Sequence, residues 1–195
     1  GAGPRSLTPT ANGTKGATAL HAVSRVLGGT ASGGSDVTAD TFGKATFGQV
    51  TAAGSTIAIS ANDLDLLGAG AGDLAPRVTA TTVNVTNRAD VSNETRLGDG
   101  PDGTAGFDVT QAEMNRISAE TVTIESGLQN VQIGALALAT GVGSSRLNIQ
   151  TTSRIDVTGT VTADGSPNTR TFMLGGNADD DINDIAARKA SVIRV

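Results

Sequence analysis

The sequence predicts an all-β fold, a right-handed parallel β-helix with about 24–25 residues per coil. Three observations support this prediction: an apolar-polar-apolar triplet recurs, its copies are regularly spaced, and turn-forming residues separate them. Each triplet is typical of a short strand with one buried face. The copies between positions 122 and 157 are Val122-Thr123-Ile124, Val131-Gln132-Ile133, Leu147-Asn148-Ile149 and Ile155-Asp156-Val157.

The spacing of the triplets is more informative than their composition. Val122 and Leu147 lie 25 positions apart, and Val131 and Ile155 lie 24 apart. Steps of 21 to 26 positions reach further copies, which begin at Ile57, Val83, Phe107, Phe172 and Ile193. A repeat of this length buries its apolar face by stacking on its neighbours, which predicts a solenoid. The alternative is an antiparallel β-sandwich, which also has many short strands.

The composition fits a narrow solenoid interior. The 195 residues include 2% aromatic residues and neither Trp nor Tyr, so few large rings need space in the core. Cysteine is absent, which excludes disulfides and thiolate metal sites. The net charge of −5 argues against nucleic acid as a partner. No run approaches the roughly 20 apolar residues of a membrane helix. Because the chain begins with Gly1, we expect a processed product or a fragment.

Three segments are expected along the chain. Residues 1–35 carry no triplet and are predicted to form an N-terminal arm or cap. Within them, Leu20, Val23 and Leu27 have helical spacing before two glycines, which favours a short capping helix; a flexible segment is the alternative. Residues 36–174 are predicted to form the β-helix, and residues 175–195 an acidic loop followed by a terminal coil or strand.

The polar middle residues of the triplets give a test of the predicted register. If one period equals one coil throughout, Ala58, Asn84, Asp108, Gln132 and Asp156 form a single outward column, about 4.8 Å apart. Gln132 would then separate the two aspartates and prevent the repulsion of adjacent like charges. A register in which the aspartates are neighbours or buried would contradict this coil assignment.

The acidic segment near the C-terminus contains a weak candidate calcium site. Gly175 to Asn183 resembles one copy of the calcium-binding nonapeptide G-G-x-G-x-D-x-U-x, with Ala178 in place of the third glycine. Such sites need stacked copies to complete the oxygen shell. A solvated acidic loop is therefore the alternative, and no other cofactor is predicted. The candidate ligands are Asp179, Asp180, Asp181 and Asp184.

The chain ends in strand-like residues with no polar cap. A parallel β-helix leaves unpaired backbone groups on its last coil, and these groups can recruit another strand. We therefore expect end-to-end assembly into a homo-oligomer or filament. The residues predicted to mediate assembly are Val192, Ile193 and Val195.

The stretch from Gln111 to Ile124 resembles a recurring unit of the β-helical shafts of bacterial surface exoproteins of the filamentous-haemagglutinin and autotransporter-adhesin type. In that unit, a segment of the form E-L-N-R-I-x-A-x-T-L-x-I opens each coil. The resemblance implies a β-helical shaft located outside the cell or on the bacterial cell surface. The matching residues are Glu113, Met114, Asn115, Arg116, Ile117, Ala119, Thr121, Val122 and Ile124.

The chain shows no convincing catalytic arrangement. The single histidine, His21, has no evident partner, and the serines lack a nucleophile motif. We therefore predict a structural or adhesive protein rather than an enzyme. An adhesin module that binds glycans or proteins is one alternative, and a β-helical polysaccharide lyase is another. An acidic-arginine cleft along one sheet would favour the lyase, whereas smooth Thr, Ser and Asn ladders would favour the shaft.

Overall fold

The computed structural model describes residues 6–7, 10–11, 18–21, 25–31, 36–41, 43–66, 76–88, 94–98, 106–138, 141–142, 146–163, 171–175 and 193–194. Over these residues the fold is mostly β, with largely parallel sheets. Helix α1 (Gln111–Met114) is the only helix among them.

The described strands form three sheets. The main sheet has 13 strands in the order β1-β4-β6-β8-β12-β15-β18-β19, with β2, β3, β5, β7 and β11 paired alongside this path. A four-stranded sheet has the order β10-β9-β13-β16, and β14 pairs with β17 in a two-stranded sheet. The main sheet contains β1 (Ser6–Leu7), β2 (Thr10–Ala11), β3 (Thr18–His21), β4 (Arg25–Ala31), β5 (Val37–Asp40), β6 (Lys44–Ala61), β7 (Asp63–Leu66), β8 (Val78–Asn87), β11 (Ile117–Ser118), β12 (Thr121–Glu125), β15 (Arg146–Gln150), β18 (Thr171–Gly175) and β19 (Ile193–Arg194). The other two sheets contain β9 (Thr95–Gly98), β10 (Phe107–Thr110), β13 (Val131–Ile133), β14 (Leu136–Leu138), β16 (Ile155–Val157) and β17 (Val161–Ala163).

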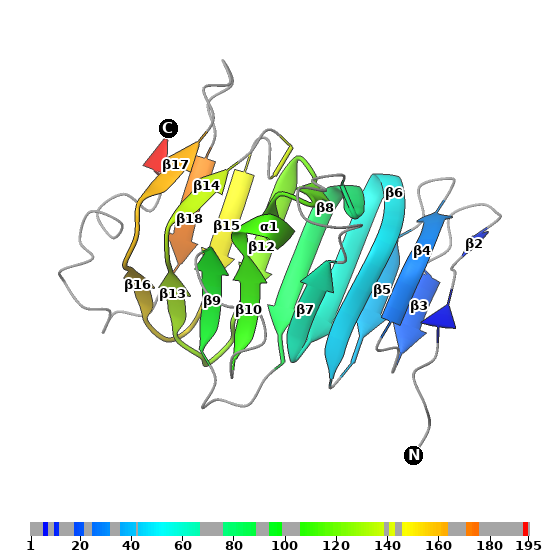
Figure 1. Ribbon diagram of the computed structural model, residues 1–195, viewed down its shortest axis with the longest axis horizontal. Helices are drawn as coiled ribbons and strands as arrows, with labels where there is room; N and C mark the ends of the chain where they lie inside the picture. Colours follow the sequence, from blue (N-terminus) through cyan, green and yellow to red (C-terminus); the bar gives the residue numbers. More distant parts are fainter. Residues whose placement is uncertain are drawn as a thin grey trace.

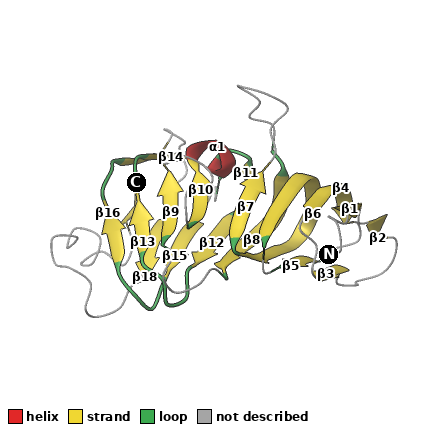
Figure 2. Cartoon of the chain, turned by 60° about the horizontal axis from the view of Figure 1, so that its bottom comes forward, coloured by secondary structure: helices red, strands yellow, loops and turns green. Residues whose placement is uncertain are grey.

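The strands lie across the long axis of the molecule and follow one another along it, from β3 and β4 towards one end to β18 towards the other (Figure 1). The four-stranded sheet and β7 lie in front in this view, with β8, β12, β15 and β18 of the main sheet behind them. Figure 2 shows the same two layers from another direction. Their facing sides enclose the core.

Strand pairing follows the predicted period over much of the chain. Ile57 pairs with Val83, Val122 with Leu147, Val131 with Ile155, and Leu147 with Phe172, all in parallel strands. These four predicted pairings are confirmed. From β12 onwards the chain visits the three sheets in turn, because β12, β13 and β14 belong to different sheets, and β15, β16 and β17 repeat that order.

The core forms from the alternation of apolar and polar residues in the strands. In β12, for example, Val122 and Ile124 are fully buried, whereas Thr121 and Thr123 are half-buried and Glu125 is exposed. The buried residues of all three sheets belong to one hydrophobic cluster, in which Phe47 and Phe107 are completely buried. Small and branched side chains fill the rest of this cluster, as the composition predicts.

The predicted single column of polar residues is wrong between residues 84 and 132. Asn84 pairs with Ala58 and Thr123, not with Asp108. Asp108 instead lies on another sheet, two strands away from Gln132, and is only 4% exposed. The cause is an enlarged connection: strands β9 and β10 and helix α1 all intervene before the main sheet resumes, so Val83 pairs with Val122, 39 positions later.

Two terminal expectations also differ from the structure. The helical spacing of Leu20 and Leu27 does not produce a helix, because Thr18–His21 and Arg25–Ala31 are parallel strands that extend the main sheet. These strands pair with others 19 to 21 positions away, a shorter step than in the triplet region. Ile193 pairs with Phe172 as its spacing predicts, but the pairing is antiparallel, so β19 does not continue the parallel series.

Glycines allow close contact at the corner between the four-stranded and two-stranded sheets. A Cβ atom on Gly159 would lie 2.2 Å from the backbone nitrogen of Ala135, and one on Gly98 would lie 2.4 Å from the carbonyl oxygen of Ala135. Gly98 also has a φ of +89°, which favours glycine. Ala135 is therefore held between two positions that have no space for a side chain.

We predict that Gly159→Ala destabilises the protein by about 2–3 kcal/mol, because the new methyl group overlaps backbone that cannot move as freely as a side chain. Gly43→Ala is the matched control, since its Cβ would meet Thr41 Oγ1 at 3.7 Å, an ordinary contact. Urea denaturation followed by far-UV circular dichroism measures both variants. Equal stability of the two would contradict the close packing at this corner.

Candidate functional site

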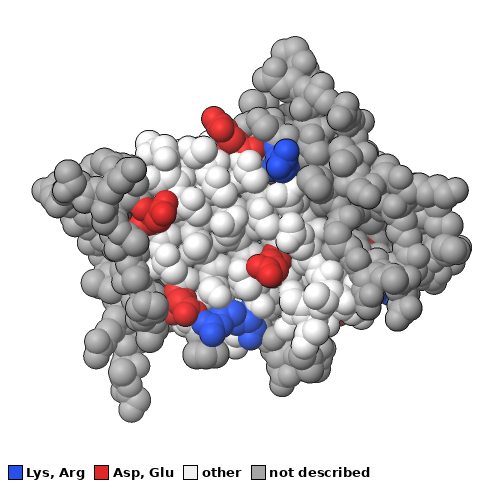
Figure 3. All heavy atoms as spheres, turned by 180° about the vertical axis from the view of Figure 1, so that it is seen from behind, with Lys and Arg blue, Asp and Glu red and all other residues white. Residues whose placement is uncertain are grey.

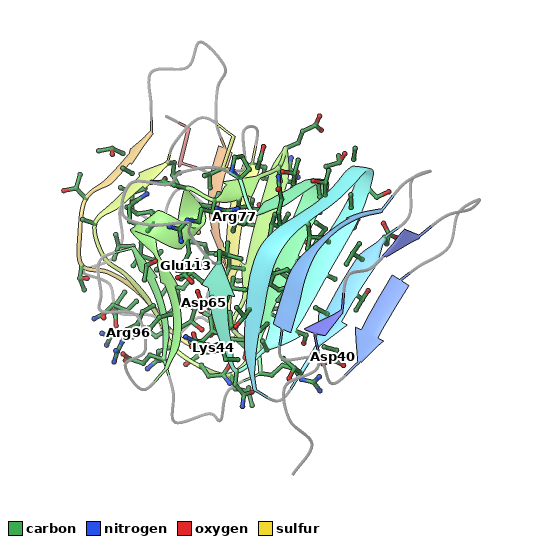
Figure 4. All side chains as sticks on the ribbon, turned by 45° about the vertical axis from the view of Figure 1, so that its right-hand side comes forward. Asp40, Lys44, Asp65, Arg77, Arg96 and Glu113 are labelled. Carbon is green, nitrogen blue, oxygen red and sulfur yellow. The ribbon has the colours of Figure 1, made fainter. Side chains whose placement is uncertain are left out.

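The outer side of the four-stranded sheet carries a row of charged and polar residues, called here the charged column. Asp108 on β10 pairs in register with Arg96 on β9, Arg96 with Gln132 on β13, and Gln132 with Asp156 on β16. Figure 4 shows Arg96 on the outer side of this sheet. Adjacent strands lie about 4.8 Å apart, so Arg96 stands between an aspartate and a glutamine in this row.

Ion pairs flank the charged column. Arg154 Nε donates to both carboxylate oxygens of Asp156, at 2.6 and 2.7 Å. Arg96 Nε lies 3.7 Å from Glu94 Oε2. Exposed pairs of this kind contribute only about 0–1 kcal/mol to stability. Like charges do not face each other on adjacent strands, because Arg96 and Gln132 separate Asp108 from Asp156.

The outer side of the main sheet is chemically different, with a central row called here the neutral ladder. Its members are small or polar and uncharged, and they pair in register across β5, β6, β8, β12 and β15. Asn148 Nδ2 donates to Thr123 Oγ1 at 3.3 Å within the row. Figure 3 shows this side as a broad surface with a few separated charges. The members are Thr38, Ala58, Asn84, Thr123 and Asn148.

An open groove lies where the main sheet turns towards the four-stranded sheet. Its volume is about 320 Å³, and Glu125 and Gln150 stand side by side along it because they are paired residues of β12 and β15. Both side chains are exposed. The lining residues are Glu125, Gly127, Gln150, Thr151 and Thr152.

Hydrogen bonds between two stacked turns hold the base of the groove in place. The carbonyl oxygen of Gly127 accepts from the Thr152 backbone N–H at 2.7 Å, from Thr152 Oγ1 at 2.8 Å and from Thr151 Oγ1 at 3.1 Å. Thr151 Oγ1 also donates to the carbonyl oxygen of Gln129 at 2.6 Å. Gly127 has a φ of +61°, which the tight turn requires. The groove is therefore built on ordered backbone.

The residues of the resemblance motif have structural contacts instead of forming a site. The Glu113 side chain is 3% exposed, and its Oε1 accepts from the Leu66 backbone N–H at 3.1 Å. Its Oε2 accepts from the backbone N–H and the hydroxyl of Thr110, both at 2.9 Å, in a capping box that begins α1. Arg116 donates to the Leu66 carbonyl oxygen. Figure 4 shows Glu113 near β7 and α1.

A glutamine beside this motif covers the edge of the two-stranded sheet. Gln111 Oε1 accepts from the Ala137 N–H, and Gln111 Nε2 donates to the Ala137 carbonyl oxygen, both at 2.6 Å. The side-chain amide thus makes the two hydrogen bonds that a neighbouring strand would make to β14. Helix α1 therefore connects β7 and β14, which are far apart in sequence.

We predict that Glu113→Ala destabilises the protein by about 2–3 kcal/mol, because the buried N–H groups of Leu66 and Thr110 lose their acceptor. Glu113→Gln should cost less, since one acceptor oxygen remains. Glu120→Ala is the control, because Glu120 is an exposed glutamate a few residues after α1. Urea denaturation distinguishes them, and equal effects at positions 113 and 120 would show that the buried contacts contribute nothing.

The structure describes only some of the site residues expected from the sequence. Asp179, Asp180, Asp181 and Asp184 lie outside the described residues, as do Val192 and Val195. Ile193 lies in β19 and pairs with β18. His21 ends β3. Among the described residues, no group of three His, Asp or Glu side chains is placed to hold a metal ion.

Two features of these faces were not predicted from the sequence: strand β9 and the groove. Strand β9, which carries Arg96, has Thr95 where the triplet pattern needs an apolar residue, so it gave no signal. The groove did have a signal: Glu125 and Gln150 each follow a triplet and are 25 positions apart. No described helix is long and apolar enough to cross a membrane.

Comparison with protein-family models, with curated proteins and with solved structures finds no match to this chain. The functional argument therefore depends on the geometry of the two sheet faces, the groove and the strand ends.

Proposed function

We propose that the chain is a right-handed parallel β-helix that serves as a rigid shaft, adhesive stalk or filament-forming subunit outside the bacterial cell or on its surface. The observation that carries this proposal is the repeated order of sheets, in which β12, β13 and β14 are followed by β15, β16 and β17 stacked on them in register. A chain that returns to each sheet after about 25 residues climbs one strand spacing per turn.

Hydrogen bonds at the corners between sheets support a stiff structure. Thr95 Oγ1 accepts from Asn87 Nδ2 at 2.7 Å and lies 2.6 Å from Ser126 Oγ. Thr95 and Ser126 are fully buried, and Asn87 is 5% exposed. Asn87 and Thr95 belong to one pass of the chain and Ser126 to the next, so the hydrogen bond between Thr95 and Ser126 fixes the register of one pass on the next.

The ends of the described sheets support end-to-end assembly. Within the described residues, β3 pairs only with β5, and β19 pairs only with β18, so each of these strands has an outer edge. Open strand edges recruit further strands. Among the described residues, the antiparallel β19 pairs only with Thr171 and Phe172 of the five-residue strand β18, and we expect a neighbouring molecule to pair with the rest of that edge.

Negative-stain electron microscopy over a concentration series tests this proposal. We expect unbranched fibres at high concentration, with an axial repeat of one or a few subunits. A variant with Val192→Asp, Ile193→Asp and Val195→Asp should lose them, because charges disfavour strand pairing at that end. Leu128→Asp should keep them, because Leu128 is exposed and follows β12, an inner strand of the main sheet. Discrete short particles at every concentration would contradict self-assembly.

The charged column favours a second candidate function, cleavage of an acidic polysaccharide by a lyase. Arg96 supplies a guanidinium that can pair with a uronate carboxylate, and it stands between Asp108 and Gln132 in the register of the sheet. We expect that a lyase would convert polygalacturonate to unsaturated products with ultraviolet absorbance, and that Arg96→Ala would lower the rate at least tenfold. Arg146→Ala, on the other sheet, is the control. Absence of product with the unmodified chain would reject this candidate.

A further inference from the structure

We propose that the groove between the turns at residues 125–129 and 150–153 binds a short stretch of a neutral polysaccharide. The site differs from the charged column and does not depend on end-to-end assembly. Its volume of about 320 Å³ is at the lower end of the range for small-molecule pockets, which suits one or two sugar units.

The polar groups of the groove match the hydroxyl groups of sugars. Glu125 and Gln150 are adjacent on paired strands, so a carboxylate acceptor lies beside an amide that both donates and accepts. Thr152 uses its hydroxyl proton to bond Gly127, which leaves its oxygen as a further acceptor. A surface with more acceptors than donors selects a ligand rich in O–H donors.

The charge of the groove selects against acidic ligands. Among the described lining residues only Glu125 is charged, and it forms no ion pair with another described residue. A uronate or sulfated sugar would place a second negative charge beside this carboxylate, which is unfavourable. One carboxylate is also few for calcium, which takes six to eight oxygen ligands, usually including several carboxylates.

Residues on both sides of the groove provide further contacts for a polymer. Leu128 follows Gly127 at the same turn and is 69% exposed, which provides an apolar surface for the C–H groups of a sugar ring. On the other side lies the outer face of the main sheet, where Thr123 and Asn148 of the neutral ladder lie two residues before Glu125 and Gln150. A chain that leaves the groove would therefore pass over uncharged hydrogen-bonding groups.

The strength of binding should be modest. The chain has neither Trp nor Tyr, and Phe47 and Phe107 are buried, so these rings cannot stack on a sugar. Hydrogen bonds to solvent-exposed groups contribute little individually. A single groove should therefore bind with a Kd of about 1 mM, and several aligned copies would bind more tightly through avidity.

Backbone amide NMR spectra of the whole chain, titrated with cellohexaose, laminarihexaose or mannohexaose, test this proposal. At least one neutral hexaose should shift the signals of residues 125–129 and 150–153. Glu125→Gln and Gln150→Ala should each weaken binding by about fivefold to tenfold. Glu120→Gln, which removes an exposed carboxylate outside the groove, should leave binding unchanged.

Three results would overturn the proposal. These are the absence of shifts at the groove with all three neutral hexaoses, stronger shifts there with trigalacturonate or calcium chloride, and unchanged binding in both groove variants.

Discussion

The structure depends on parallel pairing between strands that lie about 20 to 40 positions apart in sequence. Each inner strand of the main sheet satisfies its backbone N–H and C=O groups with the passes before and after it, as β12 does with β8 and β15. This pairing sets the side-chain columns as well. A shift by one residue would move Val122 and Ile124 from the core to the surface. Core, corners and outer faces therefore share one register.

Polar residues enter the interior where the regular period is interrupted. Thr95 occupies a column otherwise filled by Phe107, Val131 and Ile155, and its hydroxyl is satisfied by Asn87 and Ser126. Glu113 has a similar role at the end of β7, where it accepts from Leu66. An unsatisfied buried polar group would cost about 1–3 kcal/mol, so these specific bonds make the enlarged connection compatible with the stack.

The sequence predicts pairing well where one triplet column continues, and poorly where the chain leaves it. The 24-position step from Val83 to Phe107 is a coincidence of spacing, because the two residues belong to different sheets. The connection that separates them has no periodic pattern of its own. Strand β9 within it could not be recognised, because its first residue, Thr95, is polar. The spacing of Leu20 and Leu27 failed for another reason: parallel pairing with neighbouring strands outweighed a weak helical pattern. Of the candidate sites, only the groove is indicated by the sequence, through the regular step from Glu125 to Gln150.

The two outer faces carry different chemical groups. In the charged column, Arg96 and Arg154 are already engaged with carboxylates, so a ligand there must replace existing ion pairs. Along the row that leads to the groove, the short residues Ser60 and Thr86 are paired in register before Glu125 and Gln150, so the side chains lengthen where the row reaches the groove. Longer polar side chains can converge on a ligand, whereas short ones present a flat surface. In the proposed shaft, in-register stacking supplies the stiffness, and we expect recognition where the repeated residues change.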